Sequence, residues 1–348
     1  MVHTFKAFRI VVLWVLLASS MSLLASCATT EVAPPNHAET LPEAITIPYR
    51  ISSAGRFMID IAVNGHPARP FAIDTGATLS VIYEKDLEAL NLTADSETVL
   101  VRGLVTVGIR PVIDQVEFEI GMQTILKDRV AVLETPTIND GAIGLLGTDV
   151  LATYAVVFNK ENMMATFVPS EYVTPRSFIG WRQIPVRDRV ESYPDKGLHF
   201  AQIFLEDKKV PVLIDTGSNL NFVNWPLATL DPDMQRLQRT IRKNREVQGA
   251  LDTSPLRIRT RFHDLILGRH YWPEIDVVVM ELDTLSTVAP VDKSFMIAGA
   301  GLFTPWTVAF DLGGNQLYIR ANPEDPRPPS RNTIIRQSQF VPQTNPGQ

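Results

Sequence analysis

The chain has 348 residues, a hydrophobic fraction of 45% and a formal net charge of −6 at pH 7, which is enough material for two ordinary domains. Nucleic acid is not an expected partner, because no cluster of Lys and Arg interleaves with aromatic residues. The single cysteine excludes an intramolecular disulfide, and the six histidines show no ligand spacing, so we expect no metal site and no cofactor.

Residues 1–26 have the pattern of a bacterial secretory signal. A basic start precedes an apolar stretch that ends in Leu-Ala-Ser-Cys, which resembles a lipobox. The resemblance implies that Cys27 becomes a lipidated N-terminus, which would anchor the protein to a membrane without spanning it. Ala28 after the cysteine implies sorting to an outer membrane, with the protein facing the periplasm. A plain signal peptide with an incidental cysteine is the alternative.

Both ends of the mature chain are expected to lack structure. Residues 27–43 are rich in Thr, Pro, Glu and Ala, and residues 322–348 contain several prolines followed by Gln, Ser and Asn. Such segments have too few large apolar residues to offset the entropy of ordering. We therefore expect a flexible tether before the folded body and a disordered Pro-rich tail after it.

The body of the chain contains a repeat. Residues 71–79 read Phe-Ala-Ile-Asp-Thr-Gly-Ala-Thr-Leu, and residues 212–220 read Val-Leu-Ile-Asp-Thr-Gly-Ser-Asn-Leu. In each, an apolar run long enough for a buried strand leads to an aspartate, Asp74 or Asp215, and a Thr-Gly bend. A charge at the end of a buried strand is costly unless it is hydrogen-bonded or functional. A capped turn is the alternative for either aspartate taken alone.

The repeat extends on both sides of the aspartates. Residues 147–158 align with residues 299–310, and an alternating strand followed by a turn precedes each motif. The second unit carries an insertion around residues 231–251. The remainder is mostly strand, so we predict an all-β fold of two small β-barrel lobes, residues 44–170 and residues 181–321, joined by a short linker.

With these features the sequence resembles the aspartic peptidases of the pepsin and retropepsin type. The resemblance covers roughly residues 45–320 and rests on the two Asp-Thr-Gly motifs and the later apolar-apolar-Gly elements that end at Gly147 and Gly299. It implies a two-lobed acid-protease fold in which those elements cross behind the aspartates and a pseudo-twofold axis brings Asp74 and Asp215 together. The compact lobes favour a monomeric, retropepsin-like pseudo-dimer; pairing between lobes of separate molecules is the alternative.

The resemblance also implies roles for the neighbours of the two aspartates. The hydroxyls of Thr75 and Thr216 would bond across the axis to the backbone of the other lobe. Gly76 and Gly217 would permit the bend and donate their amides to the carboxylates. At the next position the lobes differ, because Ser218 would offer a hydroxyl to Asp215 whereas Ala77 offers none to Asp74. Fewer donors raise the pKa of a carboxylate, so we expect this difference to extend the one-proton state of the pair toward neutral pH.

A hairpin is expected to close over the substrate. Residues 98–113, with Gly103 and Gly108, are the candidate flap of the first lobe, and residues 248–259 are its candidate equivalent in the second. The absence of a tyrosine from residues 98–113 favours the retropepsin comparison over the pepsin one.

Two adjoining carboxyls suit the hydrolysis of peptide bonds by an activated water, because one can act as base while the other acts as acid. The sequence thus predicts an aspartic endopeptidase that acts on polypeptides of the cell envelope. The alternative is a lipid-anchored module that binds a peptide or an assembly partner without cutting it.

Overall fold

Strands make up most of the part of the chain that the structure describes. The computed structural model describes residues 44–103, 107–136, 140–174, 176–188, 197–205, 208–248, 257–282 and 292–328. The expected signal peptide and tether, including Cys27, lie outside the described residues, as does most of the expected tail. The described strands fall into two sets, from Ile45 to Pro169 and from Trp181 to Arg320.

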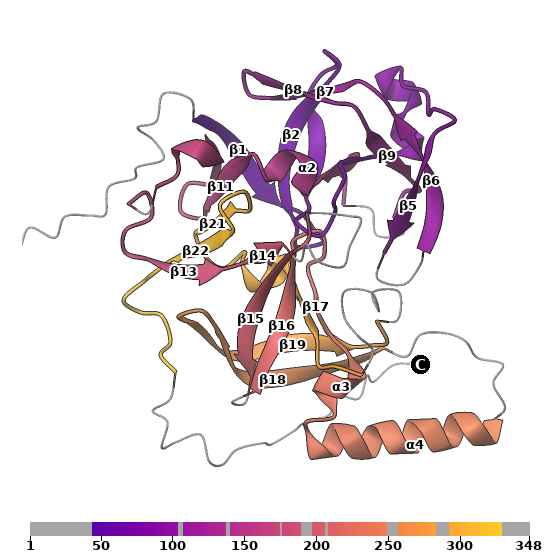
Figure 1. Cartoon of the computed structure of the whole chain (residues 1–348), viewed down its shortest axis with the longest axis vertical. Coiled ribbons are helices and arrows are strands. Elements are labelled where there is room, and N and C mark those ends of the chain that lie inside the picture. Colours follow the sequence, from indigo (N-terminus) through magenta and orange to yellow (C-terminus); the bar gives the residue numbers. More distant parts are fainter. Residues whose placement is uncertain are drawn as a thin grey trace, which may run out of the picture. The chain divides into compact units, whose positions relative to one another are not determined.

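The first set forms the N-terminal lobe (Figure 1). Its strands are β1 (Ile45–Ile51), β2 (Phe57–Val63), β3 (Arg69–Ile73), β4 (Val81–Tyr83), β5 (Thr98–Arg102), β6 (Val107–Ile113), β7 (Val116–Ile120), β8 (Gln123–Lys127), β9 (Val130–Leu133), β10 (Gly144–Leu146), β11 (Tyr154–Asn159) and β12 (Met164–Pro169). Its short helices are η2 (Glu84–Asp86), η3 (Glu88–Leu90), α2 (Thr148–Leu151) and η4 (Ser170–Tyr172). The β2–β3 hairpin turns at Asn64 and Gly65, which both have positive φ, as expected of an Asn-Gly turn.

The second set forms the C-terminal lobe (Figure 1). Its strands are β13 (Trp181–Pro185), β14 (Arg187–Asp188), β15 (His199–Leu205), β16 (Lys208–Asp215), β17 (Asn221–Val223), β18 (Ile258–Leu267), β19 (His270–Val279), β20 (Met296–Gly299), β21 (Val308–Asp311) and β22 (Gln316–Arg320). Its helices are α3 (Trp225–Ala228), α4 (Pro232–Gln248) and η6 (Ala300–Leu302).

The two lobes use the same crossing behind their aspartates. In the N-terminal lobe β10 lies between β3 and β4, parallel to β3, and Leu146 is paired with Ile73. In the C-terminal lobe β20 lies between β16 and β17, parallel to β16, with Gly299 paired with Asp215. The apolar-apolar-Gly elements therefore lie where the sequence repeat predicts them, each directly beside a motif strand.

A sheet shared by both lobes connects them. Its strand order is β13-β22-β21-β11-β12-β1, so that three strands come from each half of the chain. The halves meet where β11 pairs antiparallel with β21, through Val156 opposite Phe310 and Phe158 opposite Val308. These are the segments after Gly147 and Gly299 that aligned in the sequence, and main-chain hydrogen bonds between them fix the lobes side by side.

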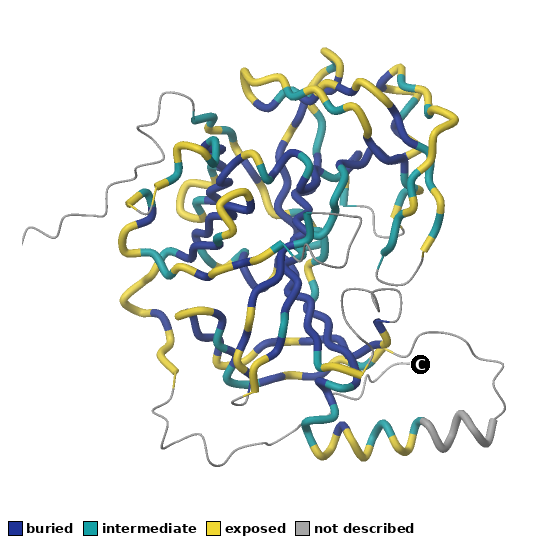
Figure 2. Tube along the Cα trace, viewed as in Figure 1, coloured by how far each residue is buried: buried dark blue, intermediate teal, exposed yellow. Residues whose placement is uncertain are grey.

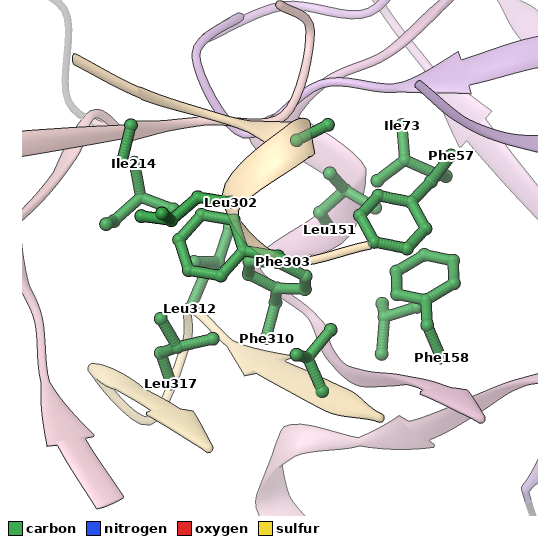
Figure 3. Packing of buried hydrophobic residues seen from close by; sticks show 14 of the residues in the cluster. Phe57, Ile73, Leu151, Phe158, Ile214, Leu302, Phe303, Phe310, Leu312 and Leu317 are labelled. Atoms are coloured by element: carbon green, nitrogen blue, oxygen red, sulfur yellow. The ribbon is translucent and has the colours of Figure 1, made fainter. Parts of the chain in front are cut away.

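The apolar core continues from one lobe into the other. Phe57 and Phe158 stack with ring centroids 4.3 Å apart, and Phe310 of the other half lies edge-on to Phe158 at 6.2 Å. Figure 3 shows this group with Ile73 and Ile214, the residues that precede the two aspartates. Figure 2 shows the buried strand segments converging on the same central region. The two aspartates are thus at the ends of strands held in one common core.

Helix α4 occupies the insertion around residues 231–251, which we expected to be an addition to the second lobe but did not expect to be helical. The Asp231 carboxylate caps its N-terminus by accepting from the amides of Asp233 (2.7 Å) and Met234 (3.0 Å). Met234 is fully buried, and Leu237 and Ile241 pack on the core at helical spacing. This narrow apolar stripe within a polar segment is why the helix was missed.

Candidate active site

The two motif bends place the carboxyl groups of Asp74 and Asp215 against each other. A Cβ atom on Gly76 would lie 2.6 Å from Oδ1 of Asp215, and one on Gly217 would lie 2.1 Å from Oδ2 of Asp74. Each carboxylate therefore occupies the space that a side chain on the opposite glycine would need. The two side chains also hydrogen-bond to each other. Only glycine at both positions allows this approach.

Thr75 and Thr216 bind the two bends together through four reciprocal hydrogen bonds. The Thr75 hydroxyl donates to the carbonyl oxygen of Ile214, and the Thr216 hydroxyl to that of Ile73, both at 2.8 Å. Each hydroxyl also accepts from the backbone amide of the other threonine at 3.1 Å. Both threonines are fully buried. The arrangement is the cross-axis bonding that the family resemblance implied, and it fixes both strands that carry the aspartates.

The environment of the pair disfavours two negative charges. Burial raises the pKa of Asp74 above its ordinary value, although the Gly76 amide, which donates to Oδ1 at 2.8 Å, opposes this. Burial and then the charge of Asp74 raise the pKa of Asp215 to about 8, against the opposing effect of the Gly217 amide at 3.0 Å. Because two adjoining carboxylates cannot both ionise cheaply, this environment favours the retention of one proton by the pair.

The expectation that the Ser218 hydroxyl bonds to Asp215 was wrong. The Ser218 hydroxyl donates to the carbonyl oxygen of Leu220 (3.3 Å) and accepts from the Leu220 amide (3.2 Å), forming a local turn. Ser218 supports Asp215 through its backbone amide, just as Ala77 supports Asp74. The difference between Ala77 and Ser218 therefore does not reach the carboxylates, and it is not the source of asymmetry in the pair.

A buried ion pair beside Asp74 was not foreseen. Arg56 donates to Asp140 through Nε (2.9 Å) and Nη2 (2.7 Å), and the side chains of the two residues are 10% and 1% exposed. Arg56 also hydrogen-bonds the Tyr83 hydroxyl. We call Arg56, Asp140 and Tyr83 the Arg56 cluster. Its positive charge acts on Asp74 and lowers the pKa of that carboxyl, against the larger effect of burial.

The candidate flap is a two-stranded arm formed by β5 and β6. Gly103 follows β5 and Gly108 lies within β6, while residues 104–106 are outside the described part. Leu100 and Ile109 are paired across the hairpin and are 46% and 67% exposed. The arm joins the lobe where the end of β6 pairs with β9. Most of the candidate equivalent in the second lobe, residues 248–259, lies outside the described residues.

Two further aspartates near the motifs make local contacts. Asp149 accepts from the Ser80 hydroxyl at 2.8 Å and lies 3.7 Å from the Lys127 amine. Asp311 accepts from the Ser170 hydroxyl at 2.9 Å. Among the described residues, no group of His, Cys, Asp and Glu has an arrangement that would hold a metal ion.

A comparison with protein-family models supports the resemblance in the first lobe. Residues 59–150, which include Asp74 and the element at Gly147, match the family model described as aspartyl protease. A search among curated proteins gave no match. The crystal structure of an aspartic proteinase from Irpex lacteus matches with a TM-score of 0.47 and 13% sequence identity, covering 79% of this chain and 96% of that one. The match to the aspartyl protease family model thus covers most of the first lobe, including the first of the two Asp-Thr-Gly motifs.

Proposed function

We propose that this protein is an aspartic endopeptidase whose catalytic pair is Asp74 and Asp215. The observation that carries the proposal is the contact of the two carboxyl groups, each backed by the other lobe's glycine and held by the Thr75–Thr216 bonds. A pair of capped turns would not require two distant segments to place their carboxyls in contact. The aspartyl protease match over residues 59–150 agrees with this function.

The chemistry follows from one proton shared by two carboxyls. The ionised carboxylate takes a proton from a water molecule as the water oxygen bonds to the peptide carbonyl carbon. The protonated carboxyl donates its proton to the carbonyl oxygen, which gives a neutral tetrahedral diol. Return of a proton to the amide nitrogen then accompanies cleavage of the C–N bond and releases a carboxylic acid and an amine. No covalent intermediate with the protein forms.

The substrate we propose is a polypeptide of the bacterial envelope, and the β5–β6 arm is the proposed flap. Exposed Leu100 and Ile109 give the arm an apolar surface that a bound peptide would cover. A monomer suffices for the pair, because both aspartates come from one chain whose halves share a sheet.

We further propose that the protein is a lipoprotein anchored through Cys27 and facing the periplasm from the outer membrane. Within the described residues there is no helix long and apolar enough to cross a membrane. Labelling of growing cells with a palmitate analogue tests the anchor directly. Label should be incorporated into the full-length chain and lost in Cys27→Ala; label that remains in the variant would rule the anchor out.

The peptidase proposal is tested with a mixed peptide library read by mass spectrometry at several pH values. Wild-type protein should cleave, and Asp74→Asn and Asp215→Asn should each lose cleavage by several orders of magnitude while remaining folded. Asp311→Asn is the matched control, because Asp311 is also a buried aspartate but makes local contacts with Ser170 and Gly314. Peptides that bind without being cut by the wild type would instead identify a binding module.

A further inference from the structure

The two lobes differ at the residue opposite each aspartate. In the first hairpin Met58 pairs with Ala72, and in the second Phe200 pairs with Leu213. Continuing both antiparallel registers by two residues places Arg56 opposite Asp74 and Leu198 opposite Asp215. Equivalent positions of the repeat therefore carry a cation in one lobe and an apolar side chain in the other.

Arg56 is fixed in place from three sides. Its guanidinium makes the paired bonds to Asp140 and a further bond to Tyr83, and its backbone amide donates to the Ser52 hydroxyl at 3.2 Å. Because these bonds hold the buried guanidinium, its positive charge stays at a fixed position in the structure. The charged or titratable groups that interact with Asp74 are Arg56, Asp215 and Tyr83, and both Tyr83 and Asp140 contact Arg56.

The surroundings of Asp215 contain no such cation among the described residues that act on it. Its neighbours are the Asp74 carboxyl and the backbone amides of Gly217 and Ser218. Leu198, at the position equivalent to Arg56, packs against an apolar cluster that includes Phe200 and Leu213. The backbone donors to the two carboxyls are alike, so the difference in charge between the two sides comes from Arg56.

We propose that Arg56, held by Asp140 and Tyr83, is a positioning residue that polarises the pair, so that Asp74 is the carboxylate that activates water and Asp215 holds the proton. This inference rests on the proposed peptidase function and assigns the two acid–base roles within it. Asp140 has a defined part, because its negative charge partly offsets the cation that faces Asp74. The Arg56 cluster thus sets the strength of the polarisation as well as its direction.

Two variants should shift the titration of Asp74 in opposite directions. Asp140→Asn leaves Arg56 charged without its counter-ion, so the acid limb of the kcat/KM profile should move to lower pH. The neutral pair Arg56→Gln/Asp140→Asn removes the cation without stranding a buried charge, so the acid limb should move to higher pH. An opposite charge within ~4–6 Å shifts a carboxyl by roughly 1–3 pH units, and because Asp140 offsets part of it, we expect about one unit. The single variant Arg56→Lys keeps the positive charge and should retain most of the wild-type profile.

Leu198→Met is the matched control in the other lobe and should leave the acid limb unchanged. A purely structural ion pair would lower kcat in both test variants without moving their pH profiles in opposite directions. The inference is overturned if the wild type cleaves peptides but the acid limbs of the two test variants coincide with each other or move in the same direction from the wild-type position.

A readout that does not depend on turnover separates this inference from the proposed function. The side-chain carboxyl carbons of aspartate are labelled with carbon-13 and titrated by NMR, with the Asp74 signal identified by its loss in Asp74→Asn. We expect Asp74 to ionise at lower pH than Asp215, and the order to weaken in Arg56→Gln/Asp140→Asn. Titrations that behave this way without any cleavage would refute the peptidase function and leave the polarised pair standing. Titrations unaffected by either variant would refute the polarisation.

Discussion

Asp215→Asn should stabilise the folded protein at neutral pH while abolishing the proposed peptidase activity. Burial and the charge of Asp74 raise the pKa of Asp215 to about 8, whereas the ordinary value is 3.8. At pH 7 the folded protein therefore holds a proton that the unfolded chain has released. Such a difference favours unfolding increasingly as the pH rises from the unfolded value toward the folded one. Asparagine has no proton to bind, so the substitution removes this dependence.

The size of this stability difference follows from the interval between the ordinary pKa of aspartate and the pH of the measurement. Each unit of pKa difference corresponds to about 1.4 kcal/mol, and the interval between the ordinary value and pH 7 is about three units, so the carboxyl of Asp215 destabilises the fold by about 4 kcal/mol at pH 7. Below the ordinary value both states are protonated and the effect vanishes. The free energy of unfolding of Asp215→Asn should thus exceed that of the wild type by about 4 kcal/mol at pH 7 and by less than about 1 kcal/mol at pH 4.

Urea unfolding at a series of pH values measures this difference without a substrate. The exposed Asp60, whose side chain is 54% accessible, gives the matched control Asp60→Asn, which should not reproduce the rise at pH 7. A gain in stability that is the same at pH 4 and pH 7 would contradict the reasoning, because it would come from packing rather than from a bound proton. Destabilisation at pH 7 would contradict it more strongly.

The cross-axis bonds and the buried histidine give two further predictions. Thr216→Val keeps the side-chain shape but leaves the carbonyl of Ile73 and the amide of Thr75 without their partner, so urea unfolding should show a loss of about 2–4 kcal/mol; a loss below about 1 kcal/mol would contradict the proposed importance of these bonds. Burial lowers the pKa of His270 from 6.5 to about 4, so its contribution to stability is present above pH 6.5 and is lost as the pH falls toward 4. Wild-type protein should lose about 3 kcal/mol over this range that His270→Gln does not lose, whereas His263→Gln, at a side chain that is 43% exposed, should behave like the wild type.

The repeat predicted the pair of aspartates because its information is local. Each motif consists of a buried strand, an aspartate and a Thr-Gly bend that follow one another in the sequence. The duplication of this motif identified Asp74 and Asp215 together with the crossing elements behind them. The expected hydrogen bond from the Ser218 hydroxyl to Asp215 was wrong even though it joins residues close in the chain, because a local bond to Leu220 competes with the bond to the carboxylate. A choice between two nearby acceptors depends on a side-chain rotamer, which the residue pattern does not specify.

The Arg56 cluster could not be predicted for a different reason. Arg56 and Asp140 are far apart in the chain, and they meet because the β1–β2 turn lies beside the segment that leads into β10. Nothing in the sequence around either residue indicates a partner at that distance. Helix α4 was missed because only its apolar stripe on the core, and not an overall hydrophobic segment, distinguishes it from a polar loop.

In a duplicated fold this site has two opposing requirements, one for symmetry and one for asymmetry. The carboxyls must meet in a fixed geometry, which favours identical halves, and the Thr-Gly bends, the reciprocal threonine bonds and the close-approaching glycines are the same in both lobes. The proposed acid–base chemistry needs one carboxyl to be ionised and the other protonated; proximity favours a single shared proton, and a difference between the halves decides which carboxyl holds it. The lobes diverge one strand away, where the extended hairpin registers place Arg56 at the position opposite Asp74 and Leu198 at the position opposite Asp215. Symmetry in the groups that position the pair and asymmetry in the charge beside it satisfy both requirements at once.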